Sequence, residues 1–215
     1  MHIDIFSDPI CPWCFIGKRR LQRALEGRPK LRPTIRWRPF QLNPAMPREG
    51  MARQAYLASK FGSIAEAERL YANIGHVGML EGVDFRFDSI AVTPNTVDAH
   101  RLIRYAEAYG LDGALVDAIF AAYFLEGRDI GDPAVLARIA GEVGLEHGPA
   151  LAFLMSGDGA DAVRGEDMRA RQLGIEGVPS FIVDKRFAIS GAQEPEAFHS
   201  LFDLAASSEN NLFAD

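Results

Sequence analysis

Residues 7–18 read SDPICPWCFIGK, and they contain the only two cysteines of the chain, Cys11 and Cys14. The motif follows residues 2–7, where apolar and polar side chains alternate as they do in a half-buried strand. It opens residues 12–26, where apolar side chains recur with the period of a helix. The sequence therefore predicts a strand, a short turn, and a CxxC motif at the N-terminus of a helix.

A CxxC motif in this position predicts a redox-active dithiol. Residues three positions apart share one helix face, and a small adjustment of the first turn brings them within disulfide range. Cys11 is expected at the helix N-terminus, where free backbone N–H groups and the helix dipole favour a thiolate. Pro12 suits the first turn, which needs no N–H from it. Cys14 lies one turn further in and is expected to be the more buried thiol.

Other uses of the two cysteines fit the sequence less well but stay open. A zinc site needs four ligands, while the chain has no second cysteine pair and its 5 histidines show no paired spacing. A disulfide that closes so short a loop restricts the unfolded chain little. Inert burial in a core is the remaining alternative. We therefore expect no metal site and assign the chemistry to Cys11 and Cys14.

The rest of the chain divides into a helical middle and a β-rich end. A second strand is expected over residues 34–40. Helices are expected over residues 63–80, 94–109, 112–126, 132–143, 148–155 and 159–173, with one brief strand over residues 83–87. The end is expected to hold strands at residues 180–183 and 187–190, a turn at 184–186, a helix at 194–206 and a frayed tail at 207–215.

This order predicts an α/β fold in which a thioredoxin-like unit carries an insertion. The strand–helix–strand start and the strand–strand–helix end make a complete βαβ…ββα unit. The roughly 130 residues between them are too many for a simple connection. We therefore expect a thioredoxin-like domain formed by residues 1–43 and 174–215. A large all-helical domain, residues 44–173, is expected to be inserted after the second strand.

A proline precedes the third strand of this unit, in the stretch Gly177-Val178-Pro179-Ser180. Proline is tolerated at a strand start, so an ordinary trans peptide bond is one interpretation. In a thioredoxin-like unit Pro179 would instead be cis and would face the CxxC motif. The backbone of Val178 would then be free to pair with an extended peptide as an added strand.

The motifs resemble those of the DsbA-like branch of the thioredoxin superfamily, and within it the FrnE-like group. That group is close to the 2-hydroxychromene-2-carboxylate isomerases and the kappa-class glutathione transferases. The resemblance covers nearly the whole chain. It rests on residues 7–18, 38–44 (RPFQLNP), 95–102, 177–181 (GVPSF) and 190–193 (SGAQ).

Departures from these relatives bear on the expected activity. The isomerases and kappa transferases usually have serine where this chain has Cys11, so the presence of both cysteines favours thiol–disulfide exchange. Ala192-Gln193 replaces their acidic-serine pair, which weakens a dedicated glutathione site. Trp13 stands where well-studied DsbA proteins have histidine, and it cannot supply the positive charge that would further stabilise a Cys11 thiolate.

The resemblance and the motif together predict a thiol–disulfide oxidoreductase of the DsbA/FrnE type, which acts on protein or small-molecule substrates through a mixed disulfide on Cys11. The expected catalytic residues are Cys11, Cys14 and Pro179. The expected substrate-binding residues are Pro12, Trp13, Phe15 and Val178, although Trp13 and Phe15 fit a core role equally well. The alternatives are a glutathione-dependent isomerase or transferase of the 2-hydroxychromene-2-carboxylate isomerase type, and a non-catalytic binding module. No cofactor is expected besides the cysteine pair, with glutathione as a candidate co-substrate.

The composition excludes several classes of protein. With 48% hydrophobic and 24% charged residues among 215, the chain is neither a disordered segment nor a disulfide-rich secreted scaffold. A net charge of −6 makes nucleic acid a poor partner, and no apolar run is long enough to span a membrane. The N-terminus lacks the basic start and apolar run of a secretory leader, so we expect a cytoplasmic protein. Dimers occur among the proteins that it resembles, which implies a monomer or a homodimer.

Three further features are expected to be structural. The basic run Lys18-Arg19-Arg20 is interpreted as a solvated helix face, and His100 as a helix residue with a satisfied partner. Basic residues are concentrated in residues 1–60 and acidic residues in the remainder. The two parts are expected to neutralise each other on folding.

Overall fold

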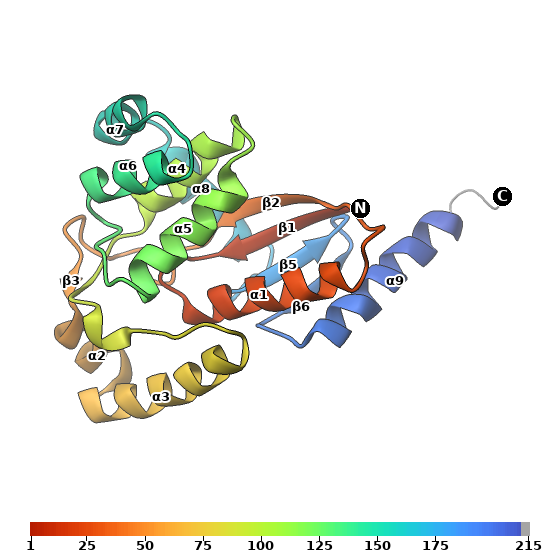
Figure 1. The fold of residues 1–215 in the computed structure, drawn as a ribbon, viewed down its shortest axis with the longest axis horizontal. Helices are drawn as coiled ribbons and strands as arrows, with labels where there is room; N and C mark the ends of the chain where they lie inside the picture. The colour runs from red at the N-terminus through yellow and green to blue at the C-terminus, as the bar shows by residue number, and fades with distance from the viewer. Residues whose placement is uncertain (212–215) are drawn as a thin grey trace.

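A four-stranded mixed sheet with the strand order β2-β1-β5-β6 forms the centre of the protein (Figure 1). The computed structural model describes the backbone of residues 1–211 and the side chains of residues 1–207. The strands are β1 (His2–Ser7), β2 (Thr34–Pro39), β5 (Ser180–Val183) and β6 (Phe187–Ser190). β1 pairs in parallel with β2 and antiparallel with β5, and β5 continues into β6 as a hairpin. The thioredoxin-like fold predicted from the sequence is thereby confirmed.

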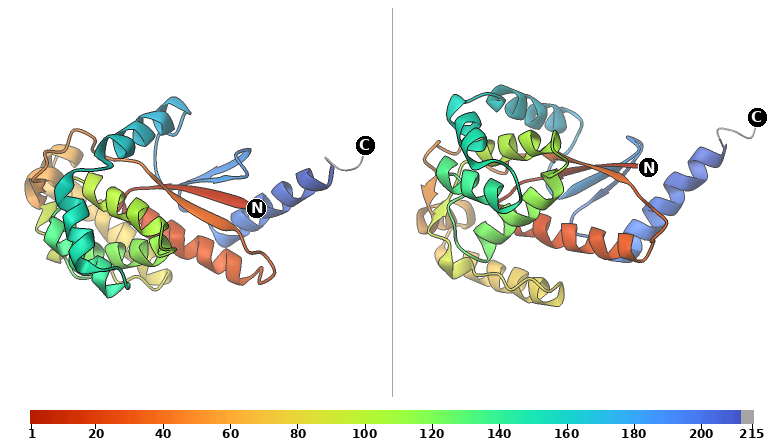
Figure 2. Two further views of the ribbon diagram at one scale, coloured as in Figure 1. Left: turned by 90° about the horizontal axis from the view of Figure 1, so that it is seen from above. Right: turned by 45° about the horizontal axis from the view of Figure 1, so that its top comes forward.

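Helices cover both faces of this sheet, as the views in Figure 2 show. They are α1 (Pro12–Glu26) and α9 (Pro195–Asn211) on one face and α8 (Ala160–Gln172) on the other. The alternation of side chains along β1 explains the two layers. Ile5 packs with Leu21 of α1 and Phe198 of α9, whereas Phe6 packs with Ala170 of α8.

The segment between β2 and β5 forms the insertion. Its helices are α2 (Arg53–Phe61), α3 (Ile64–Leu80), α4 (Val97–Glu107), α5 (Asp112–Phe124), α6 (Pro133–Glu142), α7 (His147–Ser156) and α8. The expectation of an all-helical insertion is wrong in one detail, because β3 (Met51–Ala52) pairs antiparallel with β4 (Val92–Thr93). Strands of this length are too short to show a sequence period. Within the described residues, none of the helices has the length and apolar character to cross a membrane.

Two other local expectations are wrong. Residues 83–87 form no strand, and a short 3₁₀ helix covers Phe87–Ser89. Phe85 and Phe87 stack on each other with ring centroids 4.8 Å apart, so their alternation reflects aromatic packing rather than strand pairing. Helix α9 continues to Asn211, so the frayed tail expected from residue 207 is wrong up to that point. Residues 212–215 lie outside the described residues.

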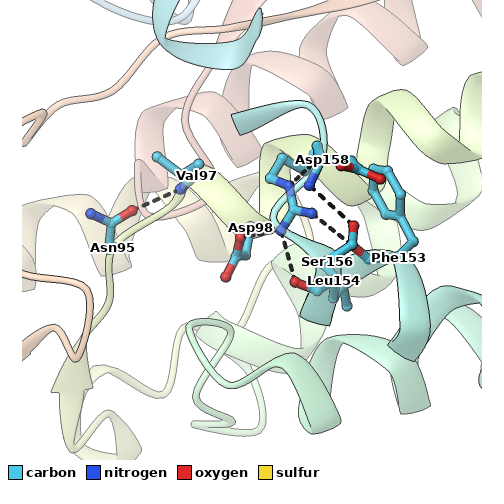
Figure 3. Close-up of polar contacts among 8 residues, drawn as sticks. Asn95, Val97, Asp98, Phe153, Leu154, Ser156 and Asp158 are labelled. Carbon is cyan, nitrogen blue, oxygen red and sulfur yellow. Dashed lines mark hydrogen bonds and ion pairs between the residues drawn. The ribbon is translucent and has the colours of Figure 1, made fainter. Parts of the chain in front are cut away.

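A buried arginine joins two helices of the insertion, and Figure 3 labels its partners Asp98, Phe153, Leu154 and Asp158. Arg101 of α4 is 1% exposed and forms an ion pair of 2.6 Å with Asp98. Its guanidinium donates hydrogen bonds to the carbonyls of Phe153 (2.7 Å), Leu154 (3.0 Å) and Asp158 (2.6 Å). Phe153 and Leu154 belong to α7, whose last carbonyls have no partner within the helix. Arg101 therefore caps α7 and fixes it against α4.

Two residues of the basic run on α1, Lys18 and Arg20, form ion pairs with other elements of the fold. The interpretation of this run as a solvated face is therefore wrong. Lys18 pairs with Asp117 of α5 at 2.5 Å. Arg20 is 8% exposed and pairs with Glu81 at 2.8 Å and with Glu194 at 2.6 Å. The part of α1 that carries Lys18 and Arg20 packs against the insertion, so these two side chains are largely shielded from solvent. The two cations bind the insertion to the thioredoxin-like unit.

Candidate active site

The CxxC motif forms the first turn of α1, as predicted. Cys11 is the N-cap residue in an extended conformation, and Pro12 occupies the first helical position. The backbone N–H of Cys14 donates to the carbonyl of Cys11 at 3.0 Å, which closes the turn. Both cysteines are free thiols and are buried, with 4% exposure for Cys11 and 2% for Cys14. The turn therefore presents two reduced sulfurs at a helix N-terminus.

The environments of the two thiols differ. Burial raises the pKa of the Cys14 thiol well above its usual value, and the adjacent Cys11 thiol, in hydrogen-bonding contact, raises it further. The backbone of Asp8 and the hydroxyl of Ser7 act in the opposite direction and are weaker. Cys14 therefore keeps its proton in the reduced protein.

The loop before β5 faces Cys11. The Val178–Pro179 peptide bond is cis, and the Cys11 Sγ lies 3.6 Å from the carbonyl oxygen of Val178, to which it donates a hydrogen bond. Among the residues that the structure describes, none accepts a hydrogen bond from the N–H of Val178. Val178 is half-buried. The structure thus brings Cys11, Cys14, Val178 and Pro179 together.

Gly17 permits this close approach, and sequence reasoning missed it. A Cβ atom on Gly17 would lie 2.9 Å from Cγ of Pro179 and 3.2 Å from Cζ of Phe181. The first distance is shorter than real Cβ contacts, so any other residue would push α1 away from the proline loop. In the sequence, a glycine in an amphipathic helix is only a weak helix former, and nothing marks its partner.

A buried carboxyl group lies behind the motif and was also missed. Asp8 is 0% exposed, and its carboxylate accepts hydrogen bonds from the N–H of Leu42 (2.6 Å) and of Ile10 (3.4 Å). Burial raises the pKa of Asp8 to about 7, against the lowering effect of these bonds and of the Thr96 hydroxyl. An aspartate between a strand and a proline resembles an ordinary turn residue in sequence. Its burial comes from α4, which is distant in the chain.

His100 of α4 faces this carboxyl group. Its Nε2 lies 3.9 Å from Oδ1 of Asp8 and has no hydrogen-bond partner. The ring forms a hydrogen bond with the backbone of Phe40. From the sequence we expect His100 to be a helix residue whose ring nitrogens have hydrogen-bond partners. It is a helix residue, but Nε2 has no partner. Burial lowers the pKa of His100 to about 4. Near neutral pH the ring is uncharged, and Asp8 is close to its midpoint of titration.

The expected substrate-binding side chains lie in different environments. Trp13 is 38% exposed at the mouth of the motif. Phe15 is buried and stacks on Phe120 of α5 with ring centroids 5.1 Å apart. Pro12 is also buried. Of its two predicted roles, Phe15 therefore has the one in the core, whereas the Trp13 side chain is accessible from outside.

Comparisons with known proteins agree with this arrangement. The chain is 32% identical to a probable DsbA oxidoreductase, SCO1869, from Streptomyces coelicolor, with a TM-score of 0.87 over 96% of this chain and 90% of that one. It is 27% identical to the uncharacterized protein YwbO of Bacillus subtilis over 92% of this chain and 94% of that protein. The cytosolic disulfide reductase DsbM of Pseudomonas aeruginosa, solved with GSH, shares the fold at 23% identity and a TM-score of 0.65, with 99% of each chain covered. The family model of the DSBA-like thioredoxin domain matches residues 2–203, and the chain belongs to that family.

Proposed function

We propose that this protein is a thiol–disulfide oxidoreductase in which Cys11 is the attacking thiol and Cys14 the resolving thiol. The observation that carries the proposal is the pair of free thiols in the first turn of α1, with Cys11 directed at the Val178 carbonyl. A helix N-terminus favours the negative charge of a Cys11 thiolate. The DSBA-like family and the relative from Streptomyces coelicolor, a probable DsbA oxidoreductase, support this class of activity.

The reaction transfers two electrons from the dithiol to a substrate disulfide. The Cys11 thiolate attacks one substrate sulfur, the substrate S–S bond breaks, and the first substrate thiolate leaves. Cys14 then loses its proton and attacks the Cys11 sulfur. The mixed disulfide breaks, the second substrate thiolate leaves, and a Cys11–Cys14 disulfide remains. In reverse, the same steps oxidise a substrate dithiol.

The residues around Cys14 favour the second step. The Asp8 backbone and the Ser7 hydroxyl contact the Cys14 thiol and stabilise its thiolate as it forms. Asp8 titrates near neutrality behind the same turn. A small thiol such as glutathione is the proposed electron source that returns the disulfide to the dithiol. The proposed setting is the cytoplasm, where such thiols are abundant.

The substrate is proposed to bind across the cis-proline loop. The N–H of Val178 is unpaired in the described part of the chain, so an extended peptide can accept its hydrogen bond as an added strand. Trp13 offers an exposed aromatic surface beside the thiols. Backbone pairing with one apolar contact suits a range of substrates rather than one fixed sequence.

Two opposite cysteine variants test the proposal. Cys11→Ser removes the attacking thiol and is expected to abolish insulin reduction with a thiol as the electron source. Cys14→Ser keeps the attack but removes the resolving step, so it is expected to accumulate mixed disulfides that mass spectrometry identifies on Cys11. Full activity of Cys11→Ser, or no adduct on Cys14→Ser, would show that the assignment is wrong.

A further inference from the structure

A second buried arginine, Arg53, has a positive charge without a negative partner. It is the first residue of helix α2 and is 7% exposed. Its side chain donates one hydrogen bond, from Nη1 to the hydroxyl of Thr93 at 3.1 Å. Its buried Nε has no hydrogen-bond partner. No carboxylate of the described residues comes within ion-pair distance of it. A buried charge of this kind is costly unless something compensates it.

Aromatic rings give part of that compensation. The Arg53 guanidinium lies over the ring of Tyr71 at 4.9 Å and over that of Tyr56 at 5.7 Å. Such contacts attract the cation but accept none of its in-plane N–H groups. Planar donors of this type match a carboxylate. The N–H groups of Arg53 therefore lack an anionic hydrogen-bond acceptor.

A cavity of about 770 Å³ lies beside Arg53. Helices α2 and α3 and residues 85–91 form its walls, and its volume is in the usual range for small-molecule sites. Tyr71 contacts Phe87 with ring centroids 4.6 Å apart, and Phe87 stacks on Phe85. One wall is thus a continuous aromatic surface. Leu57, Ile64 and Ile90 add aliphatic surface.

We propose that this cavity binds a small aromatic monocarboxylate, with the carboxylate on Arg53 and the ring against Tyr71 and Phe87. Glu68 and Asp88 are the other charged residues that line the cavity, and their charges disfavour ligands with a second negative group. No residue of the CxxC motif lines the cavity. The site is therefore separate from the thiols, and the proposal does not depend on the redox function.

Calorimetry with 2-naphthoate tests the carboxylate, and 2-naphthamide is the uncharged analogue of the same shape. The wild-type protein is expected to bind 2-naphthoate at one site, and to bind the amide at least tenfold more weakly. Arg53→Gln is expected to lose at least tenfold in affinity for 2-naphthoate, and Arg53→Lys to lose less. Circular dichroism establishes that each variant is folded.

A second pair of variants tests the cavity without changing Arg53. Ala72 and Ala65 are both exposed on helix α3, but only Ala72 lines the cavity. Ala72→Trp is expected to fill the cavity and to abolish binding, and Ala65→Trp to leave the affinity unchanged. All four variants are expected to keep wild-type insulin reduction. The proposal is overturned if the wild type shows no saturable binding of 2-naphthoate, binds the amide equally well, or loses as much affinity with Ala65→Trp as with Ala72→Trp.

Discussion

Helix α4 separates two buried polar regions that differ in how completely their groups are satisfied. On one side Arg101 pairs with Asp98 and donates to carbonyls at the end of α7 (Figure 3). On the other side its neighbour His100 has an Nε2 without a partner, 3.9 Å from the buried Asp8 carboxyl group. A fully satisfied network holds helices in place. The incompletely satisfied network, beside the two thiols, contains a carboxyl group that titrates near neutral pH.

The largest effect is expected on the Arg101 side. Arg101→Gln removes a buried cation and leaves Asp98 and the α7 carbonyls without their partner. We expect the free energy of unfolding to fall by about 3–5 kcal/mol, as when one member of a buried ion pair is lost. Urea denaturation measures it. Arg164→Gln is the control, because Arg164 forms an exposed pair with Asp161 and its loss is expected to cost less than about 1 kcal/mol. Equal losses of unfolding free energy in Arg101→Gln and Arg164→Gln would show that the buried Arg101 network stabilises the fold no more than an exposed ion pair.

The next effect concerns the His100 side and its dependence on pH. Native Asp8 keeps its proton up to about pH 7 while the unfolded residue loses it near 3.8, so its contribution to stability falls as the pH rises across that interval. Native His100 stays neutral down to about pH 4 while the unfolded residue titrates at 6.5, so its contribution falls as the pH drops. In the wild type these two dependences nearly cancel between about pH 4 and 6.5.

Single variants are expected to reveal each dependence. Relative to the wild type, His100→Gln should lose stability as the pH rises from 4 to 7, and Asp8→Asn should gain stability over the same range. The difference is expected to reach about 3 kcal/mol for His100→Gln and about 4 kcal/mol for Asp8→Asn, because each pKa unit between the folded and unfolded states corresponds to about 1.4 kcal/mol. Denaturation curves at a series of pH values measure it. Parallel curves for the wild type and both variants would contradict the titration of this pair.

A smaller effect is expected where α1 meets the proline loop. Gly17→Ala places a Cβ atom 2.9 Å from Cγ of Pro179, and overpacking of this kind costs about 1–3 kcal/mol. The thiols are also expected to react more slowly with a substrate disulfide, because Cys11 is displaced from Val178. Gly165→Ala in α8 is the control, since nothing lies within 4 Å of the new Cβ and alanine favours a helix. Stabilisation by both substitutions would show that α1 has room to move.

The smallest effect is expected from the hydrogen bond between Thr96 and Asp8. Thr96 donates a hydrogen bond that lowers the pKa of Asp8. Thr96→Val removes the hydroxyl with little change of shape and is expected to raise the pKa of Asp8 further, with a loss of about 1 kcal/mol above pH 7. NMR titration of the Asp8 carboxyl carbon measures the shift. A lower pKa in the variant would exclude the proposed hydrogen bond.

Local patterns in the sequence predict the fold and the thiols well, because both depend on neighbours in the chain. The strand of residues 2–7, the helix that begins at Pro12 and the hairpin near residue 185 all have their own period or turn residues. Asp8 and Gly17 acquire their roles from α4 and from Pro179, which are far away in sequence. The partners of Lys18 and Arg20 also come from other elements. Such long-range contacts leave no local signal.

The burial of both cysteines in the core of the insertion has a thermodynamic consequence. Cys11 and Cys14 belong to the same packed cluster as Phe120, Leu136 and Leu154. The cluster can pack differently around the dithiol and around the disulfide. Such a difference makes the free energy of unfolding of the reduced protein differ from that of the oxidised protein. By linkage the same difference shifts the reduction potential of the pair in the folded protein from its value in the unfolded chain, by about 30 mV for each 1.4 kcal/mol. Packing in the insertion is therefore expected to shift the reduction potential of the Cys11–Cys14 pair.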